Sequence, residues 1–123
     1  SDMPMGGKVE AIDAYFYQYK SELVGSAKRT VDQIIQFMNA NPAMRVEIIG
    51  HSDKEEVELA RSESSLKSLA EDRAKNTREY MAENGVDRRR ILYKSMDDKE
   101  PVSTMSTPLS LAKNRRVEFR IVL

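Results

Sequence analysis

Apolar residues follow two different periods along this chain, and each period predicts a different kind of element. Segments rich in β-branched and aromatic residues, in which apolar positions alternate or form a short run, are typical of strands. We expect strands at residues 9–19, 44–50, 89–96 and 115–123. The last strand is the clearest, with apolar residues on one face at Val117, Phe119, Ile121 and Leu123.

Between the strands the apolar spacing changes to three or four residues, which predicts two amphipathic helices. The two apolar stripes are Ala27, Val31, Ile34, Ile35 and Met38, and then Leu66, Ala70, Ala74, Thr77 and Met81. Ser26 can cap the first helix, and residues 39–42 should end it. Ser68 and Glu71 fit the S-x-x-E capping-box pattern, so the second helix is expected to start near Ser68, and it should end at Gly85.

Three segments lack both patterns. Residues 54–65, KEEVELARSESS, are charged and serine-rich and predict a mobile, solvated loop with at most one helical turn. Residues 97–108 predict a second loop, and 109–114 a short helical turn. The order β-α-β-α-β-β predicts an α/β fold of the α+β two-layer sandwich type. Its two main helices should cover one face of a four-stranded mixed sheet, with the first three strands parallel and the last antiparallel.

Composition narrows the classes of function. The chain has 123 residues, which suits one domain. Lys and Arg number 20 and so do Asp and Glu, so bulk electrostatic binding to nucleic acid or to an anionic membrane is not expected. No apolar run approaches the ~20 residues that span a bilayer, and the chain has no cysteine for disulfides or thiolate chemistry. Residues 1–7, SDMPMGG, resemble a tag remnant or linker, so we expect the domain to occupy residues 8–123. We also expect this chain to be a piece of a longer protein.

Candidate catalytic chemistry is scarce. His51 is the single histidine of the sequence, and no second ligand stands at a spacing that would hold a metal with it. Ser52 and Asp53 lie too close to it in sequence for a Ser-His-Asp triad. We therefore expect His51 to be structural, hydrogen-bonded to nearby backbone, and we predict no catalytic residue, metal or cofactor. Residues 88–90 should be a solvated strand entry, and the aromatic cluster at 15–19 should belong to the core.

Four segments, in this order, resemble one known family. They are EIIGHSD, EDRAKNTREYMAENGV, RRILYKSM and AKNRRVEFRI, and the upstream YFYQYKSEL is also similar to the family's entry segment. Together they look like the C-terminal peptidoglycan-binding domain of the OmpA/MotB family. The resemblance extends from about Val9 to Leu123. It implies a non-enzymatic component of the Gram-negative cell envelope, located in the periplasm and associated with the outer membrane and the cell wall.

The resemblance also implies a ligand and the residues that bind it. The family binds the peptide stem of peptidoglycan through diaminopimelate, whose free amino-acid end is a zwitterion. Asp53 matches the aspartate that holds the ligand's ammonium group, Arg73 matches the arginine that holds its carboxylate, and Arg115 flanks the same pocket. One carboxylate and one guanidinium at a fixed separation are the smallest set of groups that can recognise both charges of a zwitterion. Three further residues are expected to support the site: Gly50, Ser52 and Asn114.

The sequence departs from the family pattern around this site. The segment between Asp53 and Arg73 is about five residues longer than in the family. Family residues are replaced at Tyr17, Tyr19, Glu56, Leu66 and Ala70, and Glu56 stands where the family has a glycine.

Two functions are open at this point. The first is anchoring to peptidoglycan through Asp53 and Arg73. In this case the longer protein would carry an outer-membrane or lipoprotein anchor elsewhere in its chain, and a homodimer is one possible assembly. The second is a module for protein–protein interaction or envelope assembly, without a wall ligand. Convergence of Asp53 and Arg73 in an open pocket would favour the first, and a salt bridge between these two residues that fills the pocket would favour the second. For the first, truncating either charge should leave thermal stability nearly unchanged.

Overall fold

The computed structural model describes residues 10–122, so the predicted linker at 1–7 lies outside the described residues. The elements, in chain order, are β1 (Glu10–Tyr15), α1 (Gly25–Ala40), β2 (Arg45–His51), α2 (Lys54–Ala60), α3 (Leu69–Glu83), β3 (Ile91–Asp97), α4 (Pro108–Ala112) and β4 (Arg116–Val122). Short 3₁₀ turns precede α3 and β3, at Ser64–Leu66 and Arg88–Arg90. Within the described residues, no helix combines the length and the apolar character needed to cross a membrane.

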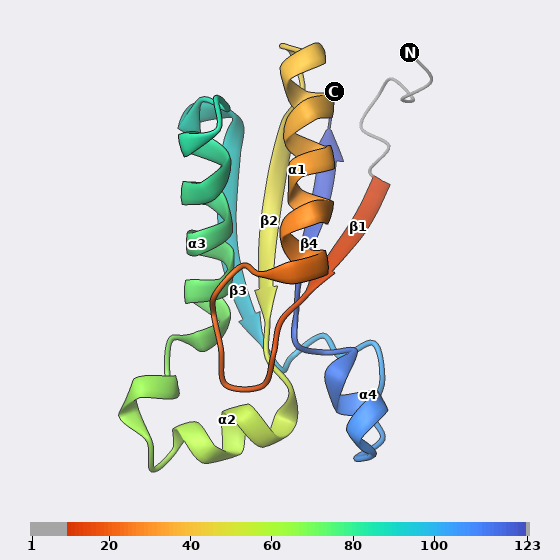
Figure 1. Cartoon of the computed structure of the whole chain (residues 1–123). Helices are drawn as coiled ribbons and strands as arrows, with labels where there is room; N and C mark the ends of the chain where they lie inside the picture. The colour runs from red at the N-terminus through yellow and green to blue at the C-terminus, as the bar shows by residue number, and fades with distance from the viewer. Residues whose placement is uncertain (1–9, 123) are drawn as a thin grey trace.

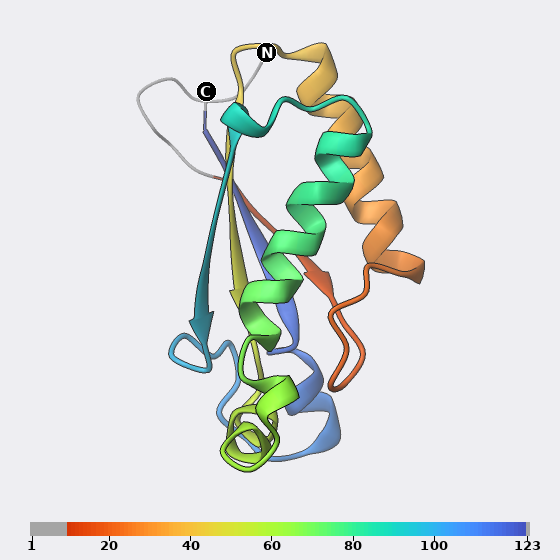
Figure 2. The same ribbon diagram turned by 90° about the vertical axis from the view of Figure 1, so that its left-hand side faces the viewer.

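The four strands form one mixed sheet in the order β1-β4-β2-β3. β2 runs parallel to β3 and antiparallel to β4, and β4 runs antiparallel to β1. The first three strands therefore point the same way, as predicted, but β4 lies between β1 and β2. Helices α1 and α3 cover one face of this sheet (Figure 1 and Figure 2). The predicted two-layer sandwich is confirmed.

The core fills the space between the sheet and the two long helices. The predicted apolar stripes supply its helical side: Val31, Met38, Ala74 and Met81 are each 0% exposed. Phe119 from β4 packs against them from the sheet and is equally buried. At about 25 cal/mol per Å² of apolar surface removed from water, this layer supplies most of the favourable free energy of folding.

Residues 54–65 differ from the prediction, because they form helix α2 and a 3₁₀ turn instead of a mobile loop. Asp53 begins α2 with a capping box: its Oδ1 accepts the Glu56 N–H at 2.6 Å, and Glu56 Oε1 accepts the Asp53 N–H at 3.0 Å. The acidic D-x-x-E pattern carries this signal in the sequence. The main helix then begins at Leu69, and Leu66 lies in the turn before it.

The turn at Arg88–Arg90 is only in part the solvated strand entry that we predicted. Arg88 and Arg89 are exposed and pair with acidic side chains on the surface. Arg90 is half-buried and donates to three backbone carbonyls, at 2.8 or 2.9 Å: those of Met38, Asn41 and Met44. This arginine therefore ties the end of α1 to the start of β2.

Candidate functional site

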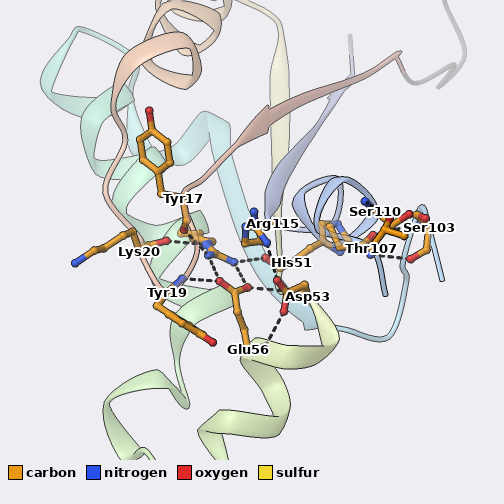
Figure 3. A network of polar contacts seen from close by, with 12 residues as sticks. Tyr17, Tyr19, Lys20, His51, Asp53, Glu56, Ser103, Thr107, Ser110 and Arg115 are labelled. Carbon is orange, nitrogen blue, oxygen red and sulfur yellow. Dashed lines mark hydrogen bonds and ion pairs between the residues drawn. The ribbon is translucent and has the colours of Figure 1, made fainter. Parts of the chain in front are cut away.

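The predicted site residues come together at one end of the sheet, where β2 ends and β4 begins (Figure 1). Asp53 follows β2, Arg73 lies near the start of α3, and Arg115 directly precedes β4. The loop at 16–24, which connects β1 with α1, reaches the same end and lies beside α2. Figure 3 shows the polar contacts that join these segments.

Arg73 is fully buried and uses every donor of its guanidinium, which has five N–H groups. Its Nε donates to the carbonyl of Lys20 at 2.9 Å, Nη1 to that of His51 at 3.0 Å, and Nη2 to that of Tyr17 at 3.2 Å. The other two donors go to the two carboxylate oxygens of Glu56, at 2.9 and 2.6 Å. Arg73 is thus fixed in one orientation and neutralised by a bidentate ion pair.

The carboxylate of Glu56 is the centre of this network. Glu56 is 1% exposed and accepts four hydrogen bonds. Two come from Arg73, one from the backbone N–H of Tyr19 at 2.8 Å, and one from the backbone N–H of Asp53 at 3.0 Å. Sequence reasoning identified Glu56 only as a replacement of a family glycine and gave it no role, although its capping-box spacing from Asp53 placed it beside the site.

Asp53 pairs with Arg115 and not with Arg73. Its Oδ2 accepts a hydrogen bond from Arg115 Nη1 at 2.9 Å, while its Oδ1 caps α2. Four charges therefore lie in sequence across the site, Arg73, Glu56, Asp53 and Arg115, and they sum to zero. The two charges predicted to hold the zwitterion, those of Asp53 and Arg73, both have partners inside the chain. Glu56 is buried and the side chain of Arg115 is 15% exposed, so truncating Arg73 or Asp53 would leave its partner without a counter-charge. From these contacts we expect a loss of stability, in place of the nearly unchanged stability anticipated from the sequence.

Backbone strain at Tyr19 helps to build the network. Its φ is 62°, in the left-handed region that side-chain-bearing residues seldom adopt. The turn directs the Tyr19 N–H toward Glu56 and the carbonyls of Tyr17 and Lys20 toward Arg73. The side chains of Tyr15, Tyr17 and Tyr19 are exposed, so the prediction that the aromatic cluster belongs to the core holds for Phe16 but is wrong for these three.

The three supporting residues make structural contacts. Gly50 lies against α3, where an added Cβ would stand 1.8 Å from the carbonyl oxygen of Ala70. Ser52 is buried, and its backbone N–H donates to the carbonyl of Asp97 at 2.8 Å. The amide of Asn114 holds the loop before α4: its Oδ1 accepts the Val102 N–H at 2.8 Å, and its Nδ2 donates to the Ser103 carbonyl at 2.7 Å.

Two open hollows flank the charge network. The first has a volume of about 340 Å³ and is bordered by Tyr15, Tyr17, Val24, Leu109, Lys113 and Arg115. The second has a volume of about 240 Å³ and is bordered by Ser52, Glu56, Val57, Ala60, Arg61 and Lys67. Arg115 and Glu56, the internal partners, thus line these hollows, although Glu56 is only 1% exposed and Asp53 and Arg73 are 0% exposed.

His51 lies on the face of the sheet away from the helices. It is 1% exposed, and its Nε2 stands 3.4 Å from Glu118 Oε1. The ring makes no hydrogen bond, so the expected bond to nearby backbone is absent, although the His51 carbonyl accepts one from Arg73. Among residues 10–122, no group of three or more His, Cys, Asp or Glu side chains is arranged to hold a metal ion.

Burial of His51 makes the stability of the domain depend on pH. Burial, reinforced by the nearby Arg116 guanidinium, lowers the pKa of His51 from 6.5 to about 4, against the opposing charge of Glu118. Between these values the unfolded chain binds a proton that the folded chain excludes, so stability is lost as pH falls from 6.5 to about 4. The difference corresponds to about 3 kcal/mol.

Urea unfolding of the parent and of His51→Gln across this pH range measures the effect. The parent should lose more stability on acidification than the variant, which has no imidazole to titrate. Equal losses would show that His51 is protonated as readily in the folded as in the unfolded chain.

The sequence profile of the OmpA family matches residues 15–115, which is most of the chain. The chain belongs to the OmpA family. The resemblance inferred from the sequence segments is therefore confirmed.

Two curated relatives extend this assignment. Outer membrane protein A of Bordetella avium is 29% identical over 120 residues, which cover 97% of this chain and 59% of that protein. A peptidoglycan-associated lipoprotein of Pseudomonas putida is 32% identical over 113 residues, which cover 91% of this chain and 64% of that protein. The chain therefore spans about three fifths of the length of these relatives.

A solved structure shows the same fold. The cell wall anchor of the T6SS from Pseudomonas aeruginosa superposes with a TM-score of 0.76 at 20% identity, covering 94% of this chain and 86% of that one. At this level of identity the likeness concerns the fold alone.

Proposed function

We propose that this domain binds peptidoglycan non-covalently and so anchors an envelope protein to the cell wall, in the periplasm of a Gram-negative bacterium. Membership of the OmpA family supports the proposal. So do the relatives named outer membrane protein A and peptidoglycan-associated lipoprotein, and the structural neighbour described as a cell wall anchor. The domain acts as a binding module without catalysis, and an outer-membrane anchor belongs to the rest of the parent protein.

The observation that carries this proposal is the set of donors around Arg73. Its two Nη atoms and the backbone N–H groups of Tyr19 and Asp53 converge on a single carboxylate. A stem-peptide carboxylate in that position would accept the same four hydrogen bonds, and the ligand's ammonium group would pair with the carboxylate of Asp53. Each charge-assisted bond contributes about 1.5–3 kcal/mol before the losses on binding are subtracted.

Those losses make a weak monomeric affinity the expected result. Desolvation of the charges and the lost freedom of the ligand offset much of the gross interaction free energy. We expect a dissociation constant for a soluble stem peptide on the order of micromolar to millimolar. Many copies facing a polymer of repeated stems would raise the overall avidity without any new contact.

A second candidate function is supported by the same network. Every donor of Arg73 and both oxygens of Asp53 already have partners within the chain. A site satisfied in this way suits a domain that keeps the fold for protein–protein interaction or envelope assembly and binds no wall ligand.

Co-sedimentation with insoluble peptidoglycan sacculi separates the two functions. The unmodified domain should sediment with sacculi. Asp53→Asn should weaken the affinity at least tenfold and lower the bound fraction accordingly. Asparagine keeps an oxygen to cap α2 but loses the charge that pairs with an ammonium group. Asp72→Asn, on α3, is the matched control and should sediment like the parent.

Two results would change the conclusion. A folded parent that stays in the supernatant would favour the protein-interaction function. Binding of Asp53→Asn equal to that of the parent would remove Asp53 from the ligand site.

A further inference from the structure

We infer that Glu56 is an intramolecular competitor for the carboxylate-binding site of Arg73, so that helix α2 closes the site from within. The identity of the carboxylate that replaces it, a peptidoglycan stem, rests on the proposed function. The existence of the site and of its internal occupant rests on the contacts of this chain alone.

The contacts of Glu56 are those of a bound ligand. Its carboxylate sits in a cradle whose donors come from the turn before α1, from helix α3 and from Asp53, the residue that caps α2 itself. Arg73 holds the cradle together through the carbonyls of Tyr17, Lys20 and His51, which do not involve Glu56. The cradle can therefore persist when the Glu56 side chain leaves it.

Few side chains attach helix α2 to the rest of the chain: Glu56 bonds Arg73, and Lys54 Nζ donates to the carbonyl of Thr104 at 3.1 Å. It is seven residues long, and Glu56 is its one buried residue. Its other side chains are exposed or half-buried, and Glu56 borders the open hollow beside α2. Since little apolar surface holds α2 in place, its position depends on polar contacts: the ion pair with Arg73, the capping box with Asp53 and the exposed bond from Lys54 to Thr104.

The ammonium half of the site is closed in the same way. Arg115 places a guanidinium nitrogen 2.9 Å from Asp53 Oδ2, where a ligand ammonium group would bind. Arg115 and Glu56 together occupy the two halves as an internal zwitterion. A zwitterionic ligand would exchange with them one charge for one charge, so the buried cluster would stay neutral before and after exchange. Binding then requires α2 and Arg115 to move. The apparent association constant equals the intrinsic one multiplied by the fraction of molecules that are open.

Chemical rescue tests the carboxylate site without any wall ligand. Glu56→Gly removes the internal carboxylate and leaves room in the cradle, and sodium acetate is the probe. Acetate should raise the thermal midpoint of Glu56→Gly in a saturable manner at pH 7, whereas sodium chloride at equal ionic strength should not. The parent and the matched control Glu55→Gln, which changes an exposed acid of the same helix, should not respond to acetate.

A second variant covers the case in which Glu56→Gly does not fold. Glu56→Gln keeps the capping box and the shape of the side chain, but its amide offers Arg73 one acceptor in place of two. This variant should bind sacculi and free diaminopimelate at least tenfold more tightly than the parent. It should also exchange the amide hydrogens of residues 54–60 faster.

The outcomes of these experiments are distinct. No acetate response in Glu56→Gly, or tighter binding absent from Glu56→Gln although the parent binds, would overturn the inference. Acetate rescue without sacculus binding by any variant would support the internal competitor and refute the peptidoglycan function. Rescue together with tighter sacculus binding supports both.

Discussion

Arg73→Met should destabilise the domain by about 3–5 kcal/mol. The substitution removes a buried cation and leaves the Glu56 carboxylate, 1% exposed, without its counter-charge. Breaking a buried pair from one side has this effect because the remaining charge keeps its desolvation penalty and loses its attraction. Three backbone carbonyls, those of Tyr17, Lys20 and His51, also lose their donor. The loss is a large fraction of the 5–15 kcal/mol typical of a whole domain.

Urea unfolding monitored by circular dichroism measures this loss. Lys75→Met, an exposed position on the same helix, is the control and should stay within about 0.5 kcal/mol of the parent. The double variant Arg73→Met/Glu56→Leu should recover part of the loss, because no charge is then stranded. A loss below 1 kcal/mol for Arg73→Met alone would show that water reaches Glu56 and replaces the guanidinium.

The helices and the sheet could be predicted because their signals are local. The apolar stripe from Ala27 to Met38 and the alternation from Val117 to Ile121 both correspond to buried faces. Strand order was harder to predict. The insertion of β4 between β1 and β2 depends on pairing between segments at opposite ends of the chain, and no local pattern records it.

The charged site shows the same division. Sequence comparison selected Asp53, Arg73 and Arg115, and the fold places all three at one end of the sheet. The sequence could not predict that Arg73 pairs with Glu56 and Asp53 with Arg115. Any acidic residue can pair with any basic one as far as a sequence shows, and the pairing is decided by distances in the folded chain. Glu56 was missed for a further reason: a capping box predicts a helix start, not a buried ion pair.

Gly50→Ala should destabilise the domain by about 3 kcal/mol and weaken any ligand binding at Arg73. The alanine Cβ would stand 1.8 Å from the carbonyl oxygen of Ala70 and 2.7 Å from its carbonyl carbon. Both atoms belong to the backbone of α3, so no side-chain rotation relieves the clash, and the helix must move away from β2. Arg73 lies one turn further along α3 and would move with it, away from the carbonyls that orient it.

Gly85→Ala separates this clash from ordinary glycine strain. Gly85 has a φ of 98°, but the nearest atom to an added Cβ is a flexible Asn39 side-chain nitrogen at 3.7 Å. Alanine there should therefore cost about 1–2 kcal/mol, from backbone conformation alone. Urea unfolding of the two variants gives the comparison, and the heteronuclear NMR spectrum of Gly50→Ala should shift most at the start of α3. Equal losses for the two variants, with an unchanged α3, would mean that β2 moves in place of the helix. The contacts of Arg73 would then not require glycine at position 50.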